Sequence, residues 1–245
     1  FKGVDIAFFS AGAAVSREYV PYATKAGAIV IDNTSAFRMD DKVPLVVPEV
    51  NPQDIKDFSN KKLVANPNCS TIQMVVVLKP IHDVAGIKRV VVSTYQSVSG
   101  AGIKAMEELS EQVVARFTQK ELKVSVFPHQ IAFNVLPEID VFLDDGYTKE
   151  EWKMVEETRK IMHADDIAIS ATCVRAPVFT GHSEAVWVEF SSPMLPDEAE
   201  RILAQAPGVK ILDDTAISLY PHPWAAAGTD EVFVGRIRRD ASHPN

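Results

Sequence analysis

The chain has 245 residues, of which 47% are hydrophobic and 24% are charged, and its mean hydropathy is +0.01. This composition excludes a disordered or collagen-like chain, and the length corresponds to one large domain or two smaller ones. The 25 basic and 33 acidic residues give a net charge of −8 without any run of five or more Lys or Arg, which argues against nucleic-acid binding.

The sequence contains no segment that predicts membrane insertion or secretion. Its longest apolar runs, such as 74–78, are far too short to cross a bilayer, and no secretory signal pattern is present. The two cysteines, Cys69 and Cys173, cannot build a disulfide framework, which favours a reducing compartment. We expect a cytoplasmic location, or a plastid if a leader has been lost.

The first part of the chain alternates short apolar runs with helix and turn signals, as a parallel α/β sheet does. Such a doubly wound sheet gathers its ligands at the carboxyl ends of its strands. The glycine-rich turn with the pattern G-x-G-x-x-G, which would open such a sheet, is not in this sequence. The expected strands are 4–9, 28–31, 45–50 and 63–65, and the expected helix is 17–26.

After Asn68 the pattern changes to longer strands that are separated by loops and a few helices, which favours a mixed, largely antiparallel sheet. Residues 70–78 predict a buried helix that stops at Lys79 and Pro80, and Thr148 with Glu151 predicts a capping box. The other expected strands are 89–98, 167–179, 185–190, 209–212 and 232–237, and the other helices are 103–119, 148–162 and 196–205.

The stretch Asn66 to Thr71 (NPNCST) carries the clearest chemical signal, because it places Cys69 between a strand and the start of a buried helix. Unpaired N–H groups at a helix start favour negative charge, so a thiol there is expected to be a good nucleophile with a lowered pKa. The alternative is a cysteine that only packs, and position alone leaves both interpretations open. Cys173 lies inside an apolar strand and is expected to belong to the core.

A nucleophilic cysteine needs a base within reach, and two of the six histidines qualify. His182 lies in a turn between two expected strands, and His129 lies in a loop. Arg175 stands in an apolar strand, where it would hold a substrate carboxylate or pair with an acidic residue of the protein. Arg38 follows a strand end, where it would meet a phosphate or solvent.

Several motifs together resemble the aspartate-semialdehyde dehydrogenase family. They are NPNCST at 66–71, YQSVSGAG at 95–102, EEWK at 150–153, CVR at 173–175 followed by GHS at 181–183, and VGRIRR at 234–239. Their order along the whole chain makes the resemblance much more specific than any single motif. It implies a partial Rossmann-type dinucleotide-binding domain at 1–68, followed by an α+β catalytic and dimerisation domain at 69–245.

The resemblance also implies NADPH-dependent reductive dephosphorylation of L-aspartyl-4-phosphate to L-aspartate-4-semialdehyde, on the route to lysine, methionine and threonine. Cys69 would form a thioester with the substrate, His182 would act as general acid/base, and Gln96 would orient the intermediate. The implied substrate ligands are Arg175 for the carboxylate and Glu150 for the ammonium. The implied phosphate ligands are Arg38, Asn68 and Lys153, and the implied NADP contacts are Ser10, Ala11, Gly12, Ser99 and Gly100.

The resemblance leaves other readings of the chain open. Family members begin with a strand and a glycine-rich loop and end with a helix that packs back on the cofactor domain. Since neither is in this sequence, we expect a fragment that binds NADPH poorly by itself. The expected assembly is a homodimer or homotetramer, and no metal is expected. The alternatives are an N-acetyl-glutamyl-phosphate reductase-like enzyme, against which a carboxylate at Glu150 argues, and a non-catalytic dimerisation or regulatory module.

Overall fold

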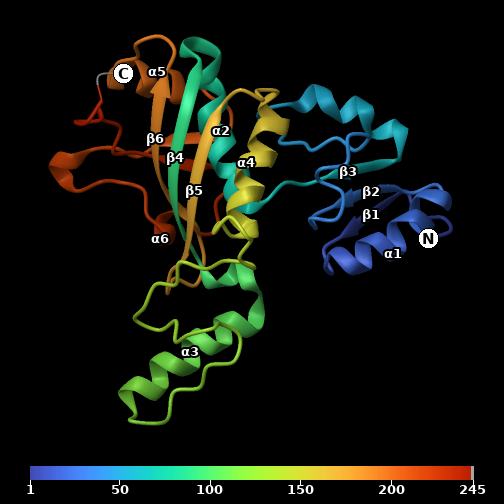
Figure 1. Ribbon diagram of the computed structural model, residues 1–245, viewed down its shortest axis with the longest axis horizontal. Coiled ribbons are helices and arrows are strands. Elements are labelled where there is room, and N and C mark those ends of the chain that lie inside the picture. Colours follow the sequence, from blue (N-terminus) through green and yellow to red (C-terminus); the bar gives the residue numbers. More distant parts are fainter. Residues whose placement is uncertain (244–245) are drawn as a thin grey trace. The chain divides into compact units, whose positions relative to one another are not determined.

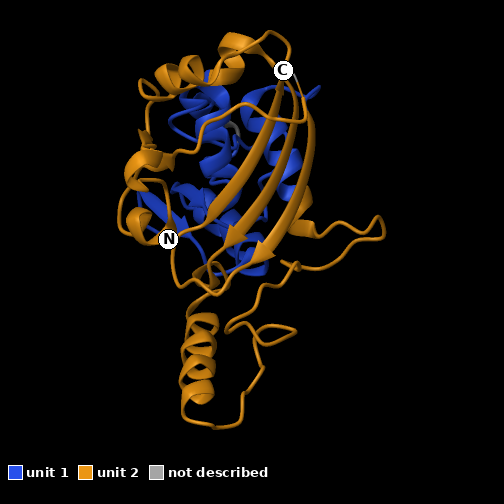
Figure 2. Ribbon diagram, turned by 90° about the vertical axis from the view of Figure 1, so that its left-hand side faces the viewer, with its two compact units in different colours: residues 1–80, 153–167 blue, residues 81–152, 168–245 orange. Residues whose placement is uncertain are grey.

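The computed structural model describes residues 1–243 and divides them into two compact units (Figures 1 and 2). The first unit comprises residues 1–80 and 153–167, and the second comprises 81–152 and the residues from 168 onward. The division falls inside two continuous helices, α2 (Cys69–Ala85) and α4 (Lys149–Met162). The domain limits 1–68 and 69–245 stay a prediction.

The first unit is built on a parallel sheet of three strands in the order β1-β2-β3. Each strand is short and apolar, and α1 packs on β1 and β2. The polar residues that follow the strands therefore lie at one edge of the sheet, as expected for a doubly wound fold. The elements of this part are β1 (Ile6–Phe9), α1 (Ala13–Lys25), β2 (Ile29–Asp32), the 3₁₀ helix η1 (Pro52–Asn60) and β3 (Leu63–Ala65).

The expected strand at 45–50 is wrong, because only Leu45 forms a bridge, to Ala65. Proline has no N–H to donate; Pro44 directly precedes this segment and Pro48 lies inside it. The chain then turns, with the Val50 N–H donating to the Val47 carbonyl. The apolar residues 45–47 and 50 are buried all the same, so the segment contributes to the core without belonging to the sheet.

The helix expected to stop at Pro80 instead continues to Ala85. A proline inside a helix removes one backbone hydrogen bond and costs about 3 kcal/mol. Leu78 and Ile81 are both buried, on either side of the proline. Apolar burial on the two flanking turns offsets the local cost, which is why the stop signal is overridden.

The second unit contains a mixed sheet with the order β5-β4-β6, in which β4 pairs parallel with β5 and antiparallel with β6. The mixed sheet is confirmed, with one parallel and one antiparallel pair of strands, and β7 and β8 form a separate two-stranded parallel sheet. β4 and β5 pair in parallel because the long connection between them carries α3 and α4 and returns the chain to the start of the sheet. The elements are β4 (Ile87–Gln96), η2 (Val98–Ala101), α3 (Ile103–Phe117), β5 (Ala168–Arg175), β6 (Ser183–Phe190), α5 (Pro196–Leu203), β7 (Val209–Ile211), η3 (Thr215–Ile217), α6 (Pro223–Ala226) and β8 (Val232–Val234).

Two side chains of α3 hold the irregular segment that follows this helix. The Glu108 carboxylate accepts from the backbone N–H groups of Ser125 and Val126, and these bonds hold its pKa below the usual range although burial opposes them. The Gln112 side-chain oxygen accepts from the N–H groups of Ile131 and Ala132. Buried backbone groups of a segment without secondary structure thus find partners on one helix.

Candidate active site

Cys69 is the first residue of α2, directly after the three-residue loop 66–68 that leaves β3, and its side chain is exposed. Asn68 caps the helix, since its Oδ1 accepts from the N–H groups of Ser70 (3.0 Å) and Thr71 (3.2 Å). The flanking residues Asn68, Ser70 and Thr71 are all buried. A thiol that is accessible at a rigidly capped helix start matches the position expected for a nucleophile.

Arg38 is buried in the first unit and is engaged by protein groups. Its Nη1 lies 3.0 Å from Oε1 of Glu157, and its Nη2 donates to the Asn33 carbonyl at 2.9 Å. The other Glu157 oxygen, Oε2, accepts from the backbone N–H of Asn68 at 2.6 Å. Sequence reasoning did not single out Glu157, because a buried acid on an amphipathic helix looks like any solvent-facing glutamate.

Gln96, Glu150 and Arg175 come together in the second unit. Gln96 ends β4 and Arg175 ends β5, and the parallel register pairs them directly. The Gln96 side-chain nitrogen lies 3.4 Å from Oε1 of Glu150, and all three side chains are buried. Arg175 donates from Nη1 to the Ser97 carbonyl at 2.8 Å. The cluster offers one cation, one anion and one amide within a few ångström.

His182 is attached to the same cluster through Ser97. Its Nδ1 accepts the Ser97 backbone N–H at 3.0 Å and also lies 3.0 Å from the Ser97 hydroxyl oxygen. Burial, followed by the positive charge of Arg175, lowers the pKa of His182 to about 4, and Glu150 opposes this shift. The imidazole is therefore neutral at pH 7, and because Nδ1 accepts, the proton lies on Nε2.

Gly100 lies against both of these basic side chains. A Cβ added there would be 3.1 Å from Nη1 of Arg175 and 3.4 Å from Nε2 of His182. Ser99 lies beside it, with its hydroxyl 2.9 Å from that of Ser97. The expected cofactor contacts of Ser99 and Gly100 stay predictions, and the absence of a side chain at Gly100 leaves room for Arg175 and His182.

Three polar side chains form a hydrogen-bonded row at the carboxyl ends of β1, β2 and β3. Asn66 donates to Asn33 at 2.7 Å, and Asn33 donates to the Ser10 hydroxyl at 3.2 Å. Next to Ser10 and Ala11, Gly12 has φ = 101° and begins α1 without a side-chain cap, and nothing lies within 4 Å of a Cβ built there. An open, uncapped helix start beside polar groups has the chemistry of an anion site, and the expected cofactor contacts of Ser10, Ala11 and Gly12 stay predictions.

Glu150 and Lys153 lie in the first turn of α4, three residues apart. Glu150 is buried and Lys153 is half-buried. The predicted capping box at the start of this helix is confirmed: the Thr148 N–H donates to Glu151 Oε2 at 2.7 Å, and the Glu151 N–H donates to the Thr148 hydroxyl at 3.3 Å. Glu151 also accepts from the Cys173 N–H at 2.9 Å. His129 is placed in the irregular segment after α3.

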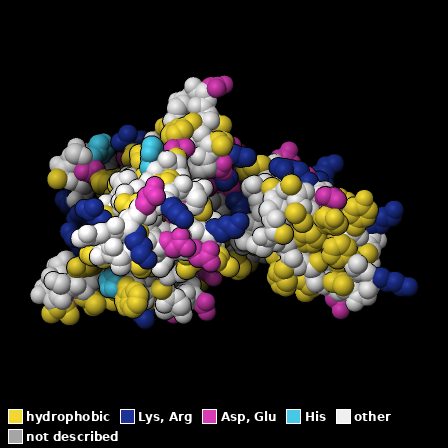
Figure 3. Space-filling model, turned by 90° about the horizontal axis from the view of Figure 1, so that it is seen from below, with side chains coloured by type: hydrophobic (Ala, Val, Ile, Leu, Met, Phe, Trp, Pro, Cys, Tyr) yellow, Lys and Arg dark blue, Asp and Glu magenta, His cyan; other side chains and the backbone are white. Residues whose placement is uncertain are grey.

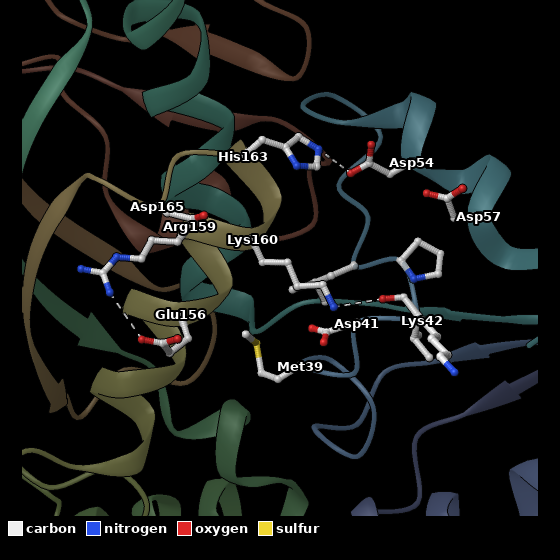
Figure 4. A pocket seen from close by; sticks show the side chains of 13 residues that line it. Met39, Asp41, Lys42, Asp54, Asp57, Glu156, Arg159, Lys160, His163 and Asp165 are labelled. Carbon is white, nitrogen blue, oxygen red and sulfur yellow. Dashed lines mark hydrogen bonds and ion pairs between the residues drawn. The ribbon is translucent and has the colours of Figure 1, made fainter. Parts of the chain in front are cut away.

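A cavity of about 630 Å³ lies elsewhere in the first unit, and it includes none of the predicted site residues (Figure 4). Lys160 extends from α4 into the loop at 38–43, where its Nζ donates to the carbonyls of Arg38 (2.7 Å), Asp40 (2.9 Å) and Val43 (3.0 Å). Burial lowers the pKa of Lys160, while Asp41, Asp40 and Glu157 oppose the shift. His163 pairs with Asp54 at 2.8 Å. Acidic and basic side chains both line this cavity, so it favours neither an anionic nor a cationic ligand.

Two searches of residues 1–243 gave negative results. No cluster of three or more His, Cys, Asp or Glu side chains within this range is arranged to hold a metal ion. No helix in the same range is long and apolar enough to cross a membrane.

The chain matches two described protein families. Residues 1–58 match "Semialdehyde dehydrogenase, NAD binding domain", and residues 78–245 match "Semialdehyde dehydrogenase, dimerisation domain". The first match supplies part of a nicotinamide-cofactor domain, and the second indicates an oligomer.

Curated relatives and solved structures agree with these matches. Aspartate-semialdehyde dehydrogenase of Aquifex aeolicus (strain VF5) is 63% identical over 98% of this chain and 71% of the relative. The Bacillus subtilis (strain 168) enzyme of the same name is 51% identical over 100% and 72%, respectively. The crystal structure of aspartate semialdehyde dehydrogenase II from Vibrio cholerae has a TM-score of 0.95 and 50% identity, over 98% of this chain and 71% of that one.

A second structure of the Vibrio cholerae enzyme, complexed with ASA, gives the same TM-score of 0.95 at 49% identity. The resemblance read from the sequence motifs is confirmed, and so is the reductive dephosphorylation in the aspartate pathway that it implies. The chain belongs to the aspartate-semialdehyde dehydrogenase family.

Proposed function

We propose that Cys69 is the nucleophile in the family's reaction, the reductive dephosphorylation of L-aspartyl-4-phosphate to L-aspartate-4-semialdehyde, and that NADPH is the reductant. One observation carries the proposal: an exposed thiol stands at the capped start of α2, between neighbours that are all buried. The helix dipole at the start of α2 stabilises a thiolate there.

In the first step the Cys69 sulfur attacks the acyl carbon of the substrate. The bond between that carbon and the phosphate oxygen breaks, phosphate leaves with the electron pair, and Cys69 carries a thioester. We assign the leaving phosphate to Arg38, Asn68 and Lys153. Arg38 pairs with Glu157 and Asn68 caps α2, so phosphate binding would share or displace those bonds.

The charges of the second-unit cluster match the amino-acid end of the substrate. Arg175 carries a planar cation that suits the α-carboxylate, and the buried Glu150 carboxylate suits the ammonium. Gln96 lies between them with its amide held at Thr94 and Glu150, a position from which it would orient the thioester. An acetylated amine would leave the Glu150 charge without a counterpart, which favours the free amino acid.

The cofactor, when bound, supplies a hydride to the thioester carbon. Ser10, Ala11 and Gly12 would hold it at the open start of α1, and Ser99 and Gly100 would flank its nicotinamide half. His182 presents the proton on Nε2, because Nδ1 is occupied by the Ser97 N–H, and it would exchange that proton as general acid/base. The preference for NADPH, assembly as a homodimer or homotetramer, and a cytoplasmic location belong to the same proposal.

The test is the substitution Cys69→Ala, with Cys173→Ala as the matched control. Cys173 is buried, and burial raises the pKa of its thiol to about 12, so it cannot supply a thiolate at neutral pH. We expect Cys69→Ala to lower kcat by at least ~10³-fold and to abolish the acyl-enzyme adduct in mass spectrometry. Turnover near the wild-type rate in Cys69→Ala would reject the proposal.

A further inference from the structure

Glu157 is a buried carboxylate that the proposed mechanism does not use. Its side chain is only 2% exposed, and it lies on α4 within the first unit. Both of its oxygens are engaged: Oε1 faces Arg38 at 3.0 Å, and Oε2 accepts the Asn68 N–H at 2.6 Å. A buried charge without partners would be very costly, so the contacts with Arg38 and with the Asn68 N–H help to keep this carboxylate in its charged form.

We propose that Glu157 is a positioning residue for Cys69, and that the ion pair of Glu157 with Arg38 sets both the place and the electrostatic surroundings of the start of α2. This inference rests on the proposed role of Cys69. It adds that the carboxylate fixes the capping residue, and that the guanidinium neutralises a negative charge which would otherwise oppose the thiolate.

The role of Glu157 in positioning Cys69 follows from the hydrogen bonds of Asn68. This residue is held by the Glu157 carboxylate through its backbone N–H and caps the helix through its side chain. Cys69 is the next residue, with its Cα about 3.8 Å farther along the chain. Rotation of the peptide between Pro67 and Asn68 would break a buried charge-assisted hydrogen bond, which is about twice as strong as a neutral one.

Arg38 is fixed from two directions within the first unit. Glu157 holds its guanidinium, and Lys160, one turn farther along α4, holds its carbonyl oxygen at 2.7 Å. The pair is therefore in place beside the start of α2 before any phosphate binds. Removal of one member changes the net charge beside the helix start.

Glu157 and Arg38 consequently shift the pKa of the Cys69 thiol in opposite directions. Glu157→Gln keeps an acceptor for the Asn68 N–H but leaves the Arg38 cation unbalanced, so it is expected to stabilise the thiolate. Arg38→Met removes the positive charge beside Glu157, so it is expected to disfavour the thiolate. A purely structural role would move both variants in the same direction.

The experiment measures the rate of iodoacetamide alkylation against pH in the full chain. Only Cys69 reacts below pH 9, because Cys173 is buried with a thiol pKa of about 12. We expect the thiol pKa to fall by about one unit in Glu157→Gln and to rise by about one unit in Arg38→Met. Glu156→Gln is the control: it makes the same change one position earlier on α4, where the side chain is 45% exposed and pairs with Arg159.

Shifts of the same sign in both variants, no shift in either, or an equal shift in Glu156→Gln would overturn the proposal. If a single variant does not fold, the double variant Arg38→Met with Glu157→Gln removes both charges, and its thiol pKa is expected within about 0.3 of the wild type. A thiol pKa in the double variant displaced by a full unit would count against it. In turnover, Glu157→Gln is expected to lower kcat about tenfold with less change in KM.

Alkylation measures the reactivity of the Cys69 thiol without requiring turnover. The proposed function and the positioning role of Glu157 can therefore be rejected independently. Opposite shifts together with full activity in Cys69→Ala would reject the proposed function alone. Loss of activity in Cys69→Ala with unshifted alkylation would reject the positioning role alone.

Discussion

The neutrality of His182 follows from its immediate neighbours. The Ser97 N–H points at Nδ1, so a proton on Nδ1 would face a donor, and burial, followed by the positive charge of Arg175, lowers the pKa of the imidazole. Sequence reasoning selected His182 for its place in a turn between strands, which was sufficient to find the residue. It could not give the protonation state, because that depends on contacts with residues 85 and 7 positions away in the chain.

The lowered pKa of His182 predicts a pH dependence of stability. The unfolded imidazole takes up its proton near pH 6.5 and the folded one only near pH 4, so falling pH favours the unfolded state within this window. We expect the stability advantage of the wild type over His182→Asn to shrink by about 1 to 2 kcal/mol between pH 7 and pH 5. Urea unfolding of both proteins at the two pH values measures it, and a constant difference would contradict it.

Other residue-scale features had no sequence signal. Glu157 follows Glu156 in a charged helix, and only the fold shows that one is buried against Arg38 while the other is exposed. Cys69 was identifiable because a strand, a short loop and an apolar helix follow one another in the chain. Local order along the chain is readable, whereas the partner of a buried charge 119 residues away is not.

At the scale of elements, one glutamate joins the start of α4 to the outer edge of β5. Glu151 closes the capping box with Thr148, and its other oxygen accepts the Cys173 N–H. β5 is an edge strand, so this N–H has no strand partner on that side. The neighbouring Glu150 and the strand that ends at Arg175 are thereby held in one arrangement.

This double role predicts unequal effects of two substitutions. Glu151→Ala is expected to destabilise the protein by about 2 to 3 kcal/mol, because it removes a cap and leaves the Cys173 N–H unpaired. Thr148→Ala removes only the cap and is expected to cost about 1 kcal/mol. Chemical denaturation measures both, and equal losses would show that the bond to β5 contributes nothing.

Element boundaries were less predictable than element types. The capping box was readable because its two residues are three apart, and β3 was predicted at its observed limits, 63–65. The strand at 45–50 and the stop at Pro80 were wrong because prolines act differently depending on what the neighbouring residues bury. Apolar burial is a property of the fold, and it overrides local signals in both directions.

For the whole molecule, the exposed apolar surface is extensive. Large apolar side chains with more than 40% exposure occur in both units, among them Phe8, Tyr22, Trp187, Ile217 and Trp224. Figure 3 shows hydrophobic side chains gathering on the right-hand part of the surface, which belongs to the first unit. Trp187, Ile217 and Trp224 are exposed within 78–245, the range that matches a dimerisation domain, and exposed apolar side chains of this kind mark sites of association.

A dimer is therefore expected in solution. Its mass would be 2 × 26.9 kDa, or 53.8 kDa. Light scattering coupled to size-exclusion chromatography at micromolar concentration distinguishes this mass from that of a monomer. A mass of 26.9 kDa that does not change with concentration would contradict the assignment.

The division into units could not be read from the chain, because it runs through α2 and α4 without a linker. No composition shift marks the return of residues 153–167 to the first unit, since α4 is one amphipathic helix from end to end. The family motifs predicted the function more directly than any argument from domain limits did.

The two hydrogen bonds that link Asn66, Asn33 and Ser10 run in the same direction. Each amide donates toward β1, so the Ser10 oxygen receives a hydrogen bond and its own proton must point elsewhere. Hydrogen bonds in a chain polarise one another, which makes the last hydroxyl a better donor than an isolated serine. The row of hydrogen bonds at this sheet edge therefore ends in the Ser10 hydroxyl, a donor that lies near Gly12. Such a donor suits a ligand oxygen that carries negative charge.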